Sequence, residues 1–124
     1  MRLLLLYLVL FASPGLACGI CIDDKVASCY DHAVVTGAKA RGDAVAFLAI
    51  EGPLVVDPEM RGAVLRTLRS TSGVQRASAR VSLENAALSF AYDPRRASLH
   101  AIRAAVDGQL GRHGLKVKLL RELR

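Results

Sequence analysis

Two residues in the sequence have the type and spacing for soft-metal chemistry. They are Cys18 and Cys21, in the run Cys18-Gly19-Ile20-Cys21. Two sulfurs at this spacing can chelate one soft ion such as Cu(I), or they can close a small disulfide. In an oxidising compartment the two outcomes are close to equally favoured. The Cys-x-x-Cys therefore predicts a two-sulfur site without deciding between a metal and a disulfide.

The third cysteine, Cys29, stands eight residues after Cys21. That separation is roughly 12 Å along a helix, too far for both sulfurs to hold one ion. Cys29 also falls on an apolar stripe, which predicts a buried, unreactive thiol. His32 could pair with Cys29 on a metal, but a half-exposed helical histidine beside Asp31 is the favoured interpretation. No hydrolytic constellation is found and no thioredoxin-type strand precedes Cys18, so the sequence predicts a binding protein and not an enzyme.

Residues 1–17 predict export. They contain a positive start, an apolar run over residues 3–12 and small residues before a cut after Ala17, which is the layout of a secretory signal peptide. The run is too short to span a bilayer, which needs ~20 apolar residues, and no later segment is long enough. We expect the mature chain in the periplasm or secreted, with no transmembrane span. A cysteine directly after the cut also marks lipoproteins, but Gly15 stands where an aliphatic residue is expected, so a lipid anchor at Cys18 is the less favoured alternative.

The charge balance is basic, with 17 Lys and Arg against 11 Asp and Glu and a formal net charge of +6. Nucleic-acid binding is not predicted, because the basic residues are scattered along the chain and few aromatic side chains are available to stack on bases. The basic side chains are interpreted as a solvated surface.

The mature chain divides into a Cys-containing N-terminal helical segment, 18–42, and a compact α+β domain, 43–124. In the segment, apolar residues at helical spacing predict one helix that begins after Cys21 and ends near Gly37. In the domain, the periodicity predicts strand 44–50, helix 59–70, strand 77–83, strand 88–92, helix 98–110 and strand 115–119. This order is the ferredoxin-like βαββαβ sandwich, here with an extra N-terminal helix, and right-handed crossovers place both domain helices on one face.

The strand at 44–50 is continuously apolar, whereas a sheet with one face in water should alternate apolar and polar residues. Both faces of this strand are therefore expected to be buried, with the N-terminal helix covering the face that the domain helices leave open. If that helix runs antiparallel to the strand, Cys18 and Cys21 come close to the loop that follows the strand.

The domain resembles the heavy-metal-associated domain family, the small domains of copper chaperones and metal-pumping ATPases, over about residues 43–119. The clearest stretches are Val81-Ser82-Leu83-Glu84-Asn85 and Phe90-Ala91-Tyr92-Asp93-Pro94, which look like the family's second strand, hairpin turn and third strand. The family carries Cys-x-x-Cys in the loop after the first strand, where two thiolates bind Cu(I) or another soft metal. The matching positions here are Asp57 and Met60, or Val55 and Pro58 on a second count, and none is a cysteine. The metal-binding role of that loop therefore does not carry over.

Taken with the resemblance, the Cys-x-x-Cys predicts an exported soft-metal-binding protein that acts in envelope metal handling. Cys18 and Cys21 are the expected ligands, Cu(I) is the favoured metal and zinc is another candidate. A second envelope metal-handling protein is the expected partner besides the metal ion. The alternative is a metal-free protein-interaction module of the same fold, whose cysteines are structural or lipidated.

Overall fold

The computed structural model describes residues 21–124. The predicted signal peptide and Cys18 lie outside the described residues. In chain order the elements are α1 (Ile22–Ser28), α2 (His32–Arg41), β1 (Ala44–Glu51), α3 (Pro58–Ser70), the 3-10 helix η2 (Arg76–Ser78), β2 (Arg80–Ser82), β3 (Ala87–Tyr92), α4 (Leu99–Leu110), the 3-10 helix η3 (Gly111–His113) and β4 (Lys116–Leu123).

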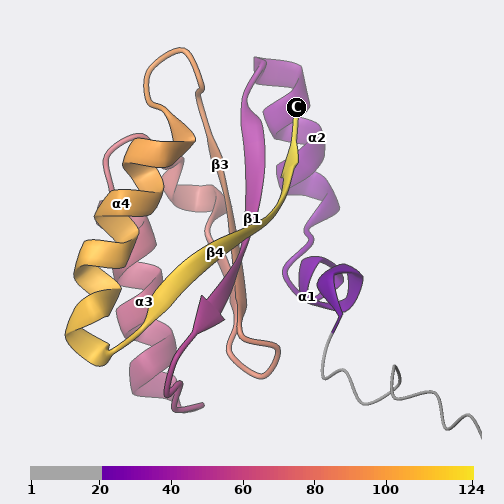
Figure 1. Ribbon diagram of the computed structural model, residues 1–124. Helices are drawn as coiled ribbons and strands as arrows, with labels where there is room; N and C mark the ends of the chain where they lie inside the picture. Colours follow the sequence, from indigo (N-terminus) through magenta and orange to yellow (C-terminus); the bar gives the residue numbers. More distant parts are fainter. Residues whose placement is uncertain (1–20) are drawn as a thin grey trace, which may run out of the picture.

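The strands form one sheet in the order β2-β3-β1-β4, and every neighbouring pair is antiparallel. Helices α3 and α4 lie side by side on one face of the sheet, and α1 and α2 lie on the other (Figure 1). From β1 onward, the strand order and the element order are those of the ferredoxin-like βαββαβ sandwich. The predicted fold class, with both domain helices on one face of the sheet, is confirmed.

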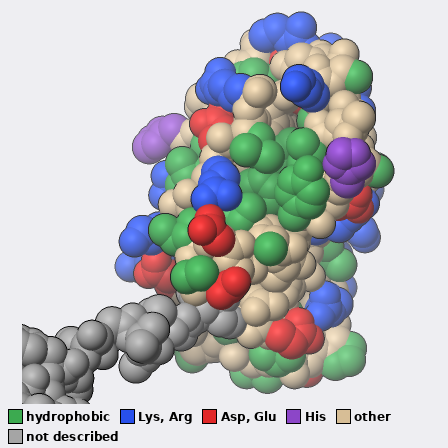
Figure 2. Space-filling view, turned by 90° about the vertical axis from the view of Figure 1, so that its right-hand side faces the viewer, with side chains coloured by type: hydrophobic (Ala, Val, Ile, Leu, Met, Phe, Trp, Pro, Cys, Tyr) green, Lys and Arg blue, Asp and Glu red, His purple; other side chains and the backbone are tan. Residues whose placement is uncertain are grey.

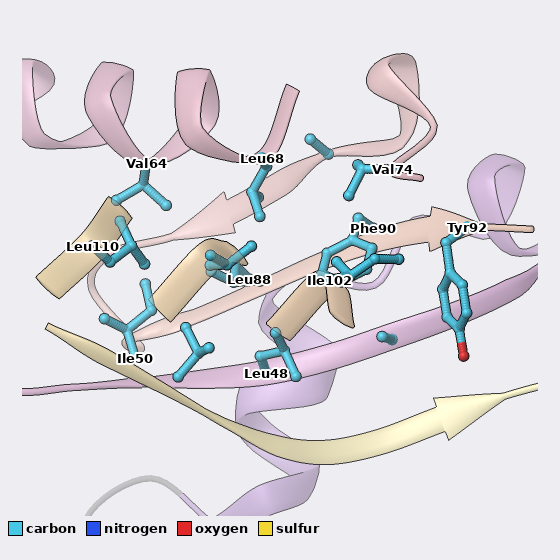
Figure 3. Close-up of a cluster of buried hydrophobic side chains, with 14 of the residues drawn as sticks. Leu48, Ile50, Val64, Leu68, Val74, Leu88, Phe90, Tyr92, Ile102 and Leu110 are labelled. Carbon is cyan, nitrogen blue, oxygen red and sulfur yellow. The ribbon is translucent and has the colours of Figure 1, made fainter. Parts of the chain in front are cut away.

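The main core lies between the sheet and the α3–α4 layer. Figure 3 shows Val64 and Leu68 of α3 reaching toward Leu48 of β1 and Leu88 of β3, with Ile102 of α4 in the same cluster. All five side chains are at most 1% exposed. Because side chains alternate along a strand, this core takes only every second residue of β1 and β3.

The intervening residues of β1 and β3 form a second cluster on the opposite face. Val45 and Phe47 of β1 pack there against Val26 of α1, Cys29 and Ala38 of α2, together with Ala87 and Ala91 of β3. Seven consecutive residues of β1 are buried, so the expected burial of both faces is confirmed. Partly buried apolar side chains continue this cluster to the surface of the α1–α2 face (Figure 2), namely Val34, Val35, Leu120 and Leu123.

The N-terminal segment is two short helices rather than the one continuous helix that the apolar stripe predicts. The chain turns between Cys29 and Asp31 because each helix end is capped there. The Asp31 carboxylate accepts hydrogen bonds from the N–H groups of Ala33 at 2.9 Å and Val34 at 3.3 Å, which begins α2. The Cys29 carbonyl, at the end of α1, accepts a hydrogen bond from the Ser89 hydroxyl at 2.8 Å.

The ends of this segment also differ from the expectation. Helix α2 passes through Gly37 and ends at Arg41, where Gly42 adopts φ 76° and closes the helix. This conformation suits glycine, which has no Cβ to clash in the left-handed region. At the other end Ile22, the first residue of the predicted stripe, is 51% exposed and does not contribute to the core.

Strands β1 and β3 are each one residue longer than predicted, and β2 and β4 differ more from their predicted ranges. Strand β2 is short because residues 76–78 form η2, in which the Ser78 hydroxyl donates to the Gln75 carbonyl and accepts from the Ala91 N–H. Strand β4 continues to Leu123, past an irregularity in its pairing with β1 between Phe47 and Leu48. None of the helices within residues 21–124 is long and apolar enough to cross a membrane.

Candidate metal centre

Cys21 is the residue immediately before α1, and its side chain is exposed. Its thiol lies 3.2 Å from Oδ2 of Asp24, one helical turn further along. The other predicted sulfur ligand, Cys18, lies outside the described residues. The structure therefore places one of the two predicted ligands, at the surface and accessible to an ion.

Helix α1 is fixed to the sheet by polar contacts on both sides. The Lys25 ammonium donates to the carbonyl of Asn85 at 2.8 Å, in the turn between β2 and β3. Asp23 forms an ion pair with Arg121 of β4 at 2.6 Å. The buried Val26 follows Lys25 in the sequence and anchors the same helix to the second cluster. Cys21 thus projects from a helix that is attached to the domain and not from a free arm.

Cys29 is buried, as the sequence predicts, with 4% of its surface exposed. Burial raises the pKa of the Cys29 thiol above its ordinary value, although hydrogen bonds with Ser89 and Ser28 oppose the shift. His32 is exposed and lies 3.4 Å from the Thr36 hydroxyl on the outer side of α2. Within residues 21–124, no three His, Cys, Asp or Glu side chains come together in a way that could hold a metal ion.

The loop between β1 and α3 carries the metal site in the family that the sequence resembles. In this chain its residues cap α3 and pack against the main core. Asp57 is the N-cap of α3 and accepts a hydrogen bond from the Met60 N–H at 2.7 Å, with Pro58 at the first helical position. Met60 is partly buried against the main core. The two exposed loop residues before the cap, Val55 and Val56, are apolar and offer no ligand atoms.

The start of α1 and the β1–α3 loop lie on different sides of the sheet. Figure 1 shows α1 beside β4 and β1 on one side, while the chain leaves β1 toward α3 on the other. The N-terminal segment does run antiparallel to β1, since α2 leads back to the start of that strand. Cys21 is nevertheless carried to the face opposite α3.

Comparison with known proteins supports the fold through solved structures alone. No protein-family model matches the sequence, and no curated protein matches it. A copper-binding domain of HMA7, a P-type ATPase, superposes with a TM-score of 0.52 at 18% identity, over 64% of this chain and 96% of that domain. Oxidised MerP from Ralstonia metallidurans CH34 superposes with a TM-score of 0.51 at 14% identity, over 64% and 99%.

The fold is that of a heavy-metal-associated domain. A third solved structure agrees, the N-terminal domain of a potential copper-translocating P-type ATPase from Bacillus subtilis in the Cu(I)-loaded state, with a TM-score of 0.50 at 26% identity over 64% of this chain and 90% of that domain. Each neighbour is covered almost completely, while about a third of this chain stays outside each match. That remainder is close to the length of residues 1–42, the part that precedes the sandwich.

The structure also brings together arginine side chains that are scattered along the sequence. Four arginines from three separate elements line one cleft that runs along α3, between the end of α4 and η2, with His113 beside them: Arg66, Arg69, Arg76 and Arg112. The spacing of the first two on one helix was the available sequence signal. Their meeting with the other two depends on how α3, η2 and η3 pack, which periodicity does not reveal.

Proposed function

We propose that the mature protein binds one soft metal ion, with Cu(I) favoured over zinc, through Cys18 and Cys21. The observation that carries the proposal is the exposed thiol of Cys21, at the start of a helix anchored to a heavy-metal-associated fold. A second sulfur three residues earlier supplies a pair that suits soft ions, whereas calcium and magnesium prefer oxygen ligands. The fold's own loop offers no cysteine at the corresponding positions.

The neighbours support a metal-binding role in general terms. The structure from Bacillus subtilis, at 26% identity, is a domain in the Cu(I)-loaded state, and its fold matches the part of this chain that carries the sandwich. The more distant neighbours show the fold alone. A role as a carrier rather than a catalyst follows from the absence of a catalytic constellation in the sequence.

The site of action that we propose is the periplasm or the extracellular space, on the basis of the signal-peptide layout of residues 1–17. A metal-binding protein there would receive or deliver its ion through another envelope metal-handling protein. If Cys18 were lipidated, one sulfur ligand would be lost and the protein would be anchored to a membrane.

The test is titration of the reduced mature protein with Cu(I) against a competing chelator. We expect one ion per chain for the wild type, and loss of tight binding for Cys18→Ser and for Cys21→Ser. Cys29→Ser is the matched control, since it also replaces a cysteine but lies in the buried cluster. Equal competition by the wild type and Cys21→Ser would refute the proposal.

The second candidate is a metal-free interaction module of the same fold, which the missing Cys-x-x-Cys in the β1–α3 loop favours. An intact mass of the purified mature protein separates the candidates, because cleavage, lipid, a disulfide and a bound ion each change the mass differently. A disulfide between Cys18 and Cys21 that resists mild reduction would support the structural role.

A further inference from the structure

The cleft that runs along α3, between the end of α4 and η2, has the chemistry of an anion site. It is an open cleft of about 810 Å³, lined by Arg66 and Arg69 of α3, Arg76 of η2, and Arg112 and His113 of η3. The remaining lining side chains are neutral, and no carboxylate faces the cleft. Positive charge is thus concentrated in one concave place.

These arginines have no carboxylate partners within residues 21–124. The ion pairs there use other guanidinium groups, those of Arg41, Arg61, Arg80, Arg95, Arg96, Arg121 and Arg124. All four cleft arginines are exposed, so their charges are available to a ligand. The like charges of these arginines also repel one another, and a bound anion would reduce this repulsion.

Compensation of the helix dipoles does not account for the cluster. Arg69 lies in the last turn of α3, and Arg112 follows the end of α4, where cations are favourable. Each helix C-terminus is equivalent to only about −0.5 of an elementary charge, so two ends balance about one of the four guanidinium groups. An excess of about three positive charges remains in the cleft.

The lining also indicates which anion fits. The cleft is lined by four arginines and by no lysine. The planar guanidinium group of arginine binds phosphate through two parallel hydrogen bonds. No Phe, Tyr or Trp side chain lines the cleft, so the large aromatic rings on which nucleic-acid bases commonly stack are absent from it. The concave shape suits a compact molecule better than a flat lipid surface. We propose that this cleft binds a compact soluble anion that carries several phosphate groups.

This site is separate from the metal site proposed above. The cleft is lined by residues of α3 from Ala63 onward, and α3 lies on one face of the sheet. Helix α1 with Cys21 lies on the opposite face of the sheet (Figure 1). The anion proposal therefore does not depend on metal binding, and it can fail or succeed independently.

The experiment is calorimetric titration of the metal-free mature protein with inorganic tripolyphosphate at low salt. We expect binding that weakens as salt rises, and a loss of at least tenfold in affinity for the double variant Arg66→Gln/Arg112→Gln. Arg66→Lys/Arg112→Lys keeps the charge but removes the fork, and we expect an intermediate loss. Lys116→Gln/Lys118→Gln removes the same net charge from exposed positions on β4 and should change affinity less than twofold.

Three results would overturn the proposal. The first is no saturable binding by the wild type at millimolar tripolyphosphate. The second is an equal loss in the β4 control, which would indicate attraction to net charge and not to the cleft. The third is the absence of tripolyphosphate binding together with cleft-dependent binding to phosphatidylglycerol vesicles, which would assign the arginines to a membrane surface. Thermal melting of each variant checks that the fold is intact.

Discussion

Removal of residues 18–42 should destabilise the sandwich strongly, because α1 and α2 cover an apolar face of the sheet. The truncation would expose Phe47 and Val45, which are 1% and 2% exposed in the full structure, together with the smaller Ala87 and Ala91. Burial of a side chain the size of valine or phenylalanine contributes roughly 1.5–3 kcal/mol, so we expect a loss on the order of 5 kcal/mol. The total free energy of unfolding of such a domain is only about 5–15 kcal/mol.

The assay is thermal and urea unfolding of the truncated and full mature chains, followed by circular dichroism. A loss of that size lowers the melting temperature by roughly 20 °C or more, since 1 kcal/mol shifts a domain of this size by about 4–8 °C. The variant Phe47→Ala gives an internal check. It should lower the free energy of unfolding by about 3–5 kcal/mol in the full chain, and by much less in the truncated chain. Leu48 lies on the other face of β1, so Leu48→Ala should lower the free energy of unfolding of the full chain and of the truncated chain equally.

A truncated domain that melts within a few degrees of the full chain would refute the reasoning. It would mean that the second cluster contributes little, and that the apolar face of β1 has another cover. Equal costs of Phe47→Ala in both chains would lead to the same conclusion.

The other predictions concern the loop, the helix break and the buried thiol. Asp57→Ala with Met60→Ala should change Cu(I) affinity by less than about tenfold, or ~1.4 kcal/mol, in a chelator competition, while loss of the cap lowers stability by about 1 kcal/mol in urea unfolding. Asp31→Ala should cost about 1–2 kcal/mol through the lost cap. The hydrogen bond from the Arg80 guanidinium, followed by those from backbone N–H groups, lowers the pKa of Asp31 in the folded protein. The stability that this carboxylate contributes is therefore present above the ordinary carboxyl pKa and is lost as the pH falls through the lower folded pKa. An Asp31→Asn variant should show a shallower acid-unfolding curve. Cys29 should react with iodoacetamide far more slowly than Cys21 in native protein, and equally fast in denaturant, by mass spectrometry; equal native rates would contradict its burial.

The order of the elements was predictable because each one carries its own local signal. The run from Ala44 to Ile50 has no polar face, which predicts a central strand buried on both sides, and the structure confirms it. Asp57-Pro58 marks the start of α3, and Ser98 marks that of α4, where its hydroxyl accepts from the Ala101 N–H at 3.1 Å. Caps and periodicity act within a few residues, so a single sequence contains them.

The break between α1 and α2 was missed because the apolar stripe continues across it. Asp31 is a good capping residue, but it also reads as a polar position on one long helix. Its partner Arg80, whose guanidinium lies 3.0 Å from the carboxylate, comes 49 residues later in the chain. The arginine cleft was missed for the same reason, since its residues meet only when α3 and α4 pack side by side. Contacts between distant segments leave no periodic pattern in the sequence.

The way the N-terminal segment is held bears on the proposed chemistry. Several polar contacts join it to the sandwich, among them Lys25 to the β2–β3 turn, Asp23 to Arg121, and Asp31 to Arg80. The two ion pairs among them lie near the surface, where such pairs are each worth at most about 1 kcal/mol, so the buried cluster beneath supplies most of the attachment. A sulfur carried by such a segment has a fixed position relative to the sheet. A metal bound there would be presented on the α1 side, so a partner that receives the ion would have to approach the face opposite α3 and α4.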